Sequence, residues 1–128
     1  MSNTLNMNRK DVQLILKELN IVPKKRLGQN FLINNATKDI IIKQAQISKN
    51  DIILEIGPGL GALTENLVKI AKKVYAVATH ALLLQNAKYR ILSAGADEII
   101  GTDSIDNEVS KVSLAKVIAE KLKDKSSL

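Results

Sequence analysis

The chain has 128 residues, 45% hydrophobic and 25% charged, which suits one small domain with a modest core. It contains no cysteine and a single histidine, so disulfides, thiolate zinc sites, cysteine nucleophiles and histidine-clustered metal sites are excluded. The net charge of +6 lies within residues 1–50, which carry nine basic and three acidic side chains, whereas residues 51–128 carry ten of each.

This uneven charge indicates a phosphate-bearing partner, for which RNA is the natural candidate. Lys24, Lys25 and Arg26 are well placed to contact phosphates, although a solubilising arm or a solvated loop explains the same charges. No apolar run is long enough to cross a bilayer, and the polar N-terminus lacks the pattern of a signal peptide. We therefore expect a cytoplasmic protein without membrane association, whose basic N-terminal extension (residues 1–50) binds RNA.

Two helices are predicted before the glycine-rich segment of the chain. The first covers residues 8–19, with an apolar stripe made of Val12, Ile15, Leu16 and Leu19. A basic loop over residues 23–32 follows it. The second helix covers residues 36–46, and we expect it to turn inward the side formed by Ile40, Ile41 and Ala45.

Strand and helix patterns then alternate along the chain. Strands are predicted at 52–56, 74–78 and 98–101 with a brief one at 109–113, and helices at about 62–72, 82–94 and 114–123. The first strand is almost entirely apolar, as expected of a parallel strand buried on both faces. The sequence therefore predicts an α/β fold, a three-layer Rossmann-like sandwich with a small, mainly parallel sheet and an N-terminal helical extension, in a single domain of residues 1–128.

The sharpest motif follows the first strand and reads Glu55-Ile56-Gly57-Pro58-Gly59-Leu60-Gly61. Glycines in such a turn let main-chain amides approach a ligand closely, because no Cβ stands in the way. The spacing is G-x-G-x-G, whereas dinucleotide dehydrogenases favour G-x-G-x-x-G. A tight turn without a ligand explains the same glycines. Glu55, a carboxylate inside a buried strand, requires a partner.

Two motifs in this order resemble the opening of the small-subunit rRNA adenine N6,N6-dimethyltransferases, over about residues 1–77. They are Lys24-Lys25-Arg26-Leu27-Gly28-Gln29-Asn30-Phe31-Leu32 and Leu54-Glu55-Ile56-Gly57-Pro58-Gly59-Leu60-Gly61-Ala62-Leu63-Thr64. The resemblance implies S-adenosylmethionine as cofactor, with the glycine loop beneath its nucleoside and the Gln-Asn-Phe-Leu segment over its methionine end. The implied cofactor-binding residues are Gln29, Asn30, Phe31, Leu32, Glu55, Gly57, Gly59 and Gly61. Phe31 and Leu32 also suit a structural contact with the core.

The chain departs from that family after the second strand. There the family carries an acid that accepts hydrogen bonds from ribose hydroxyls, whereas this chain has Ala78 in that place. Thr79 or His80 offers a partial substitute without a fixed negative charge. The family's Asn-Leu/Ile-Pro-Tyr loop, which holds the target adenine, is absent, and Tyr89 is expected in the core. The sequence therefore predicts a weak cofactor site and no catalytic residue.

Residues 70–123 instead resemble the C-terminal part of ribose-phosphate pyrophosphokinases. This resemblance depends mainly on the Thr79-His80 step and on Gly101-Thr102-Asp103-Ser104. We interpret the chain as a chimera, more consistent with engineering than with inheritance, in which a methyltransferase-like half (1–73) joins a pyrophosphokinase-like half (74–128). A natural, divergent methyltransferase is the alternative.

Two further expectations concern the second half and the first strand. For the acidic loop of Asp103, Asp106 and Glu108 a solvated turn is favoured over a cation site. The strand at 52–56 lacks the later neighbours of a full methyltransferase unless 109–113 supplies one, so its exposed edge favours a homodimer or strand swap. Three functions remain open: an inactive chimera with a weak S-adenosylmethionine site, a scaffold without a specific ligand, and a divergent active RNA methyltransferase.

Overall fold

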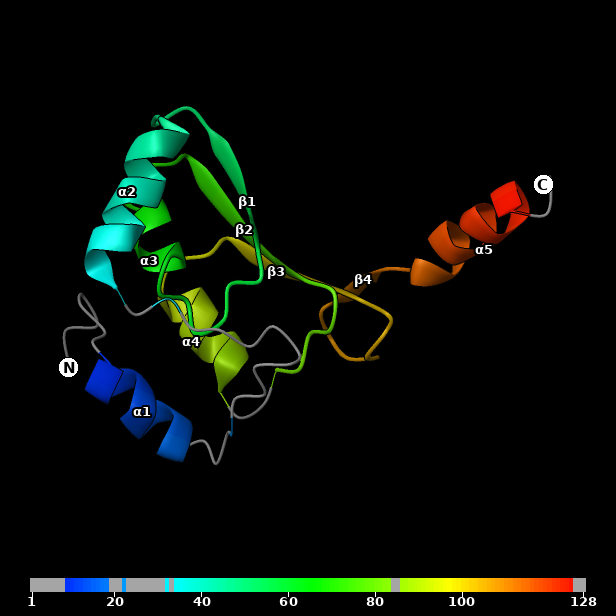
Figure 1. The fold of residues 1–128 in the computed structure, drawn as a ribbon, viewed down its shortest axis with the longest axis horizontal. Helices are drawn as coiled ribbons and strands as arrows, with labels where there is room; N and C mark the ends of the chain where they lie inside the picture. Colours follow the sequence, from blue (N-terminus) through cyan, green and yellow to red (C-terminus); the bar gives the residue numbers. More distant parts are fainter. Residues whose placement is uncertain (1–8, 19–21, 23–31, 33, 84–85, 126–128) are drawn as a thin grey trace.

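The computed structural model describes residues 9–18, 22, 32, 34–83 and 86–125, and Figure 1 shows how their elements are arranged. Two helices come first, α1 (Arg9–Glu18) and α2 (Asn35–Ala45). The strands are β1 (Ile52–Ile56), β2 (Lys73–Ala78), β3 (Glu98–Thr102) and β4 (Ser110–Val112). The later helices are α3 (Thr64–Leu67), α4 (Ala87–Ser93) and α5 (Leu114–Lys125). None of the helices in the described part of the chain has the length and apolar character needed to span a bilayer.

The four strands are parallel and lie in the order β1-β2-β3-β4. This confirms the predicted α/β class, the small parallel sheet and the Rossmann-like alternation of strands and helices after two N-terminal helices. The strand predicted at 109–113 is confirmed as β4, but it pairs with β3 and not with β1. Within the described residues, β1 therefore has a neighbour on one side only.

Side chains on one face of the sheet make the main core. Val74 and Ala76 of β2 are 1% and 0% exposed, and the strand register places Ala76 beside Ile99 of β3. Ile91 of α4 and Ala81 pack into the same cluster. Helix α3 contacts β2 and α4 contacts β3, and Figure 1 shows α2, α3 and α4 together on this side of the sheet.

On the opposite face of the sheet, the part formed by β1 is apolar and open. Ile52, Leu54 and Ile56 of β1 are 62%, 60% and 76% exposed, so the prediction that this strand is buried on both faces is wrong. Helix α5, which follows β4, stands away from the sheet (Figure 1). It therefore leaves uncovered the face on which the remaining helical layer of a sandwich would lie.

Helix α2 lies within one residue of its predicted bounds but turns a different side inward. Lys38 is 4% exposed, and Ile42, one turn later, is half-buried. Ile40 and Ile41 are 61% and 39% exposed, and Ala45 is also exposed. The predicted inward side is therefore wrong, because the buried side of the helix contains Lys38 and Ile42.

The helices after β1 and β2 are shorter than predicted. Only four residues form α3, where a helix over 62–72 was expected, because Ile70 donates its N–H to the carbonyl of Leu67, three residues back instead of four (3.1 Å). Helix α4 begins later than predicted, because Leu82 donates to the carbonyl of His80, two residues back (2.8 Å). Both segments form turns where a continuous helix was expected.

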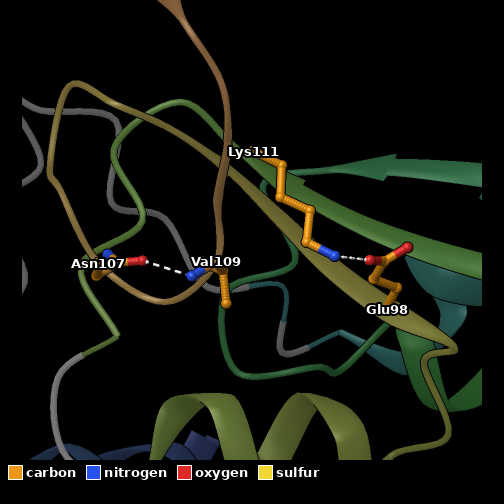
Figure 2. A network of polar contacts seen from close by, with 4 residues as sticks. All are labelled: Glu98, Asn107, Val109 and Lys111. Atoms are coloured by element: carbon orange, nitrogen blue, oxygen red, sulfur yellow. Dashed lines mark hydrogen bonds and ion pairs between the residues drawn. The ribbon is translucent and has the colours of Figure 1, made fainter.

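Polar contacts hold β4 and the loop before it, as Figure 2 shows. Lys111 of β4 forms an ion pair with Glu98 of β3. The side-chain oxygen of Asn107 accepts the N–H of Val109 at 3.0 Å, and its amino group donates to the carbonyl of Ala81 at 2.8 Å. The loop before β4 is thereby attached to the segment that follows β2.

Candidate functional site

The glycine loop turns the chain at the carboxyl end of β1. Gly57, Gly59 and Gly61 have φ angles of +76°, +58° and +82°, in a left-handed region that residues with a Cβ rarely adopt. The Gly57 N–H donates to the Val77 carbonyl at 2.8 Å, and the Gly61 N–H donates to the Pro58 carbonyl at 2.9 Å. A Cβ on Gly57 would meet nothing within 4 Å, so this part of the loop is open to an approaching ligand.

A hollow of about 130 Å³ lies against the glycine loop. Besides the loop itself, Glu55, Val12 of α1 and Leu32 line it. Leu60 of the loop is buried against Val12 and Leu16, so α1 packs over the loop. Small-molecule sites commonly enclose about 300–1,000 Å³, so the hollow in this conformation accommodates part of a nucleoside-sized ligand.

Glu55 is the buried acid of the site. It is 8% exposed, and its Oε2 accepts a hydrogen bond at 2.5 Å from Oγ1 of Thr64, which is 0% exposed. Burial raises the pKa of Glu55, whereas hydrogen bonds from the hydroxyl and the backbone of Thr64 act in the opposite direction. The expectation that Glu55 has a partner is confirmed. Thr64 was not singled out from the sequence. The feature that could have pointed to it is its position three residues after Gly61.

At the end of β2, where the family that the sequence resembles carries an acid, this chain has Ala78 followed by Thr79 and His80. Ala78 packs against the core. The carbonyl of Thr79 accepts hydrogen bonds from Thr102 Oγ1 at 2.6 Å and Ser104 Oγ at 2.7 Å, and His80 Nδ1 lies 2.9 Å from Ser104 Oγ. These contacts join the ends of β2 and β3, and none of them supplies a negative charge beside the glycine loop.

The other predicted cofactor and RNA residues are placed only in part. Leu32 is half-buried and lines the hollow together with Glu55, Gly57 and Gly59. Gly61 is buried, and a Cβ there would lie 3.4 Å from the Ala94 side chain. Six predicted residues lie outside the described part of the chain, namely Lys24, Lys25, Arg26, Gln29, Asn30 and Phe31.

Two predictions about the second half concern Tyr89 and the acidic loop. Tyr89 of α4 is 72% exposed, so its expected place in the core is wrong. In the acidic loop, Asp103 accepts the Leu114 N–H at 2.9 Å and Glu108 forms an ion pair with Lys88 at 2.6 Å. The described residues contain no group of three side chains suited to hold a metal ion.

A parallel sheet with intervening helices and a glycine loop at the carboxyl end of its first strand defines a Rossmann-like α/β protein, a class that binds ligands at this end of the sheet. A sequence profile described as ribosomal RNA adenine dimethylase matches residues 20–127. The chain belongs to the ribosomal RNA adenine dimethylase family.

Two curated relatives agree with this assignment. The chain is 38% identical over 125 residues to the ribosomal RNA small subunit methyltransferase A of Leuconostoc mesenteroides, which covers 97% of this chain and 41% of the relative. It is 42% identical over 101 residues to the protein of the same name from Pelotomaculum thermopropionicum. This match covers 79% of this chain and 34% of the relative. A dimethyladenosine transferase of known structure from Plasmodium falciparum is 32% identical, with a TM-score of 0.47 over 66% of this chain and 31% of that one. The chain thus spans about two fifths of the length of the curated relatives it matches.

These matches extend beyond the junction expected near residue 74. The family profile continues to residue 127, and the Leuconostoc relative aligns with 97% of the chain. The comparisons therefore support the methyltransferase family on both sides of the junction, and they give no support to a pyrophosphokinase-like half or to an engineered origin.

Proposed function

We propose that the chain forms a domain of the kind found in rRNA methyltransferases. This domain binds the adenosyl part of S-adenosylmethionine at its glycine loop. The observation that carries the proposal is the turn of Gly57, Gly59 and Gly61 at the carboxyl end of β1, which is open at Gly57 and lies beside a hollow lined by Gly57, Gly59 and Glu55. Main-chain N–H groups in such a turn approach a ligand without interference from side chains. The family description refers to ribosomal RNA adenine and the relatives are named ribosomal RNA methyltransferases, which supports this substrate class.

Binding requires a rearrangement of α1. An adenosyl group needs more than the hollow of about 130 Å³, and Val12 of α1 together with Leu32 forms part of its wall. Val12, Leu16 and Leu60 are buried against one another, and displacement of α1 separates the first two from Leu60. The lost apolar contacts lower the net affinity. In this proposal Gln29, Asn30 and Phe31 complete the methionine end of the site with Leu32.

The site is weak because Ala78 stands where the family carries an acid. A hydrogen bond from a ribose hydroxyl to a carboxylate contributes about 1.5–3 kcal/mol, so each missing bond weakens binding roughly 10- to 150-fold. Thr79 and His80 do not replace the acid, since the Thr79 carbonyl and the His80 ring both contact Ser104.

The chain by itself carries no methyl transfer in this proposal, because it lacks the Asn-Leu/Ile-Pro-Tyr segment that would hold the adenine. RNA binds through the basic N-terminal extension, including Lys24, Lys25 and Arg26. The chain acts as one cytoplasmic domain of residues 1–128. The chimeric junction near residue 74 stays a prediction, and sequencing the coding DNA across it in an independent isolate tests it.

Calorimetric titration with S-adenosylhomocysteine tests the cofactor site. We expect saturable binding that Gly59→Val abolishes, because its φ of +58° excludes a branched side chain. Ala119→Val, on the exposed surface of α5, is the control that leaves binding unchanged. Ala78→Asp is expected to strengthen binding roughly 10- to 150-fold.

Each alternative function predicts a different result. No saturable heat with the parent chain, or equal binding by Gly59→Val, overturns the cofactor proposal and favours a scaffold without a specific ligand. Transfer of a labelled methyl group from S-adenosylmethionine to small-subunit rRNA by this chain alone overturns the proposed inactivity and favours a divergent active methyltransferase.

A further inference from the structure

The open face of the sheet carries an apolar patch. Its main members are Ile52, Leu54 and Ile56, which are 62%, 60% and 76% exposed. Partners in a parallel register point to the same face, so Leu54 lies beside Tyr75 and Ile56 beside Val77, both half-buried. The open-face patch therefore extends from β1 onto β2 and adjoins the edge of β1 that has no strand neighbour in the described part of the chain. Contiguous apolar surface of this kind is typical of an interaction site.

Helix α5 carries a surface that matches this patch. Val117, Ile118 and Leu122 are 52%, 54% and 64% exposed and lie on one side of the helix together with half-buried Leu114. The 12 residues of α5 form a helix about 18 Å long. The five residues of β1 extend about 17 Å. One such helix therefore covers the open-face patch along its length.

The start of α5 is fixed in a direction that leads away from its own sheet. A single residue, Ser113, separates the helix from β4. The Leu114 N–H donates to Asp103 Oδ1 at 2.9 Å, and the Ala115 N–H donates to Ser113 Oγ at 3.3 Å. Folding α5 back over its own β1 would break the contact with Asp103. We propose that two copies of the chain exchange this helix, the apolar side of each α5 packing over the open-face patch of the other copy.

The area that this exchange buries is comparable with that of a stable dimer. Full burial of a Leu or Ile side chain removes roughly 100 Å² of apolar surface from water, so the six side chains that are more than half exposed offer about 400 Å² in one helix–sheet contact. Two-fold exchange makes two such contacts, about 800 Å². A standard interface of about 1,600 Å² has roughly 900 Å² of apolar surface.

Analytical ultracentrifugation of the full chain over a wide dilution range tests the association. We expect a dimer that dissociates on dilution, and Ile118→Glu is expected to weaken it about tenfold or more by placing a charge in an apolar contact. Lys116→Glu, on the other side of α5, is the control, and its larger change in charge should leave the dimer intact. Both side chains are solvent-exposed, so circular dichroism should show the parent fold in both variants.

Disulfide trapping tests the arrangement itself, because the chain has no cysteine of its own. Leu54→Cys and Ile118→Cys chains are prepared separately, mixed and mildly oxidised. The exchange predicts a disulfide between the two different chains. A monomer at every concentration overturns the proposal. A dimer that Ile118→Glu does not weaken, and in which the Leu54→Cys and Ile118→Cys chains form no disulfide with each other, also overturns it. That result favours pairing through the edge of β1.

Discussion

Replacement of Thr64 by valine removes the hydroxyl that donates to the buried Glu55 and keeps the shape of the side chain. Thr64 is 0% exposed and its Oγ1 lies 2.5 Å from Glu55 Oε2, so no solvent molecule takes over the role of the hydroxyl at this position. A hydrogen bond to a charged group contributes about 1.5–3 kcal/mol. We expect Thr64→Val to lower the free energy of unfolding at pH 7 by about this amount, 1.5–3 kcal/mol.

The loss should depend on pH, with a sign that follows from the pKa of Glu55. Burial raises this pKa above its ordinary value of 4.5, so the folded protein holds the proton more tightly than the unfolded chain does. The contribution of Glu55 to stability is therefore fully present below pH 4.5 and is lost as the pH rises through the folded-state pKa. Thr64 limits this loss by stabilising the carboxylate, so its removal costs more at pH 7 than at pH 4.

Urea denaturation followed by circular dichroism at pH 7 and pH 4 measures both effects. With the carboxyl group protonated, the bond is between neutral groups and its loss should cost about 0.5–1.5 kcal/mol. Glu55→Gln and the double variant complete a mutant cycle, in which Thr64→Val should cost less once the charge is gone. An equal loss at both pH values, or an undiminished loss beside Gln at position 55, would refute the role assigned to the hydroxyl.

Three further substitutions test separate parts of the fold. Gly95→Ala should lower stability by more than about 1–2 kcal/mol, measured by urea denaturation, because Gly95 has φ +107° and a Cβ there would lie 2.9 Å from the Val68 side chain. Asp103→Ala should reduce the helical circular dichroism signal, since Asp103 accepts the Leu114 N–H at the start of α5. That N–H lowers the pKa of Asp103 below 3.8, so in the parent chain the same signal should fall only when the pH falls below this ordinary value. Lys88→Ala breaks an exposed ion pair and should change the thermal stability by less than about 1 kcal/mol.

Features with a local signal could be predicted from the sequence. The strands β1 to β3 coincide with short apolar runs of the sequence. The glycine loop needs three residues that accept positive φ angles, and glycine is the residue that does so most readily. A helix was predicted to end near residue 94, and Gly95 follows α4 there with its N–H bonded to the Leu92 carbonyl at 2.9 Å. The need of Glu55 for a partner was also predictable, because a buried carboxylate without one is costly. In each case the property depends on a few neighbouring residues.

Features that depend on distant parts of the chain could not be predicted in this way. An apolar run such as 52–56 reads as buried on both faces, yet the exposure of Leu54 depends on where α5 goes, some sixty residues later. The contact between Thr64 and Glu55 could not be predicted, because it depends on the folded geometry of the glycine loop between them. The inward side of α2 was misassigned for a similar reason, since Lys38 is buried by packing and not by its own hydrophobicity.

The pairing of β4 connects the shape of the sheet with its open face. Parallel neighbours are usually joined by a crossover of a dozen or more residues, whereas β3 and β4 are joined by residues 103–109 alone. This short loop lets β4 pair only with the last residues of β3, where Gly101 lies opposite Ser110 and Thr102 opposite Val112. Strand β4 therefore continues outward past the end of the sheet and carries α5 with it (Figure 1). Among the described residues, the short β3–β4 connection thus directs α5 away from the open face of β1 instead of over it.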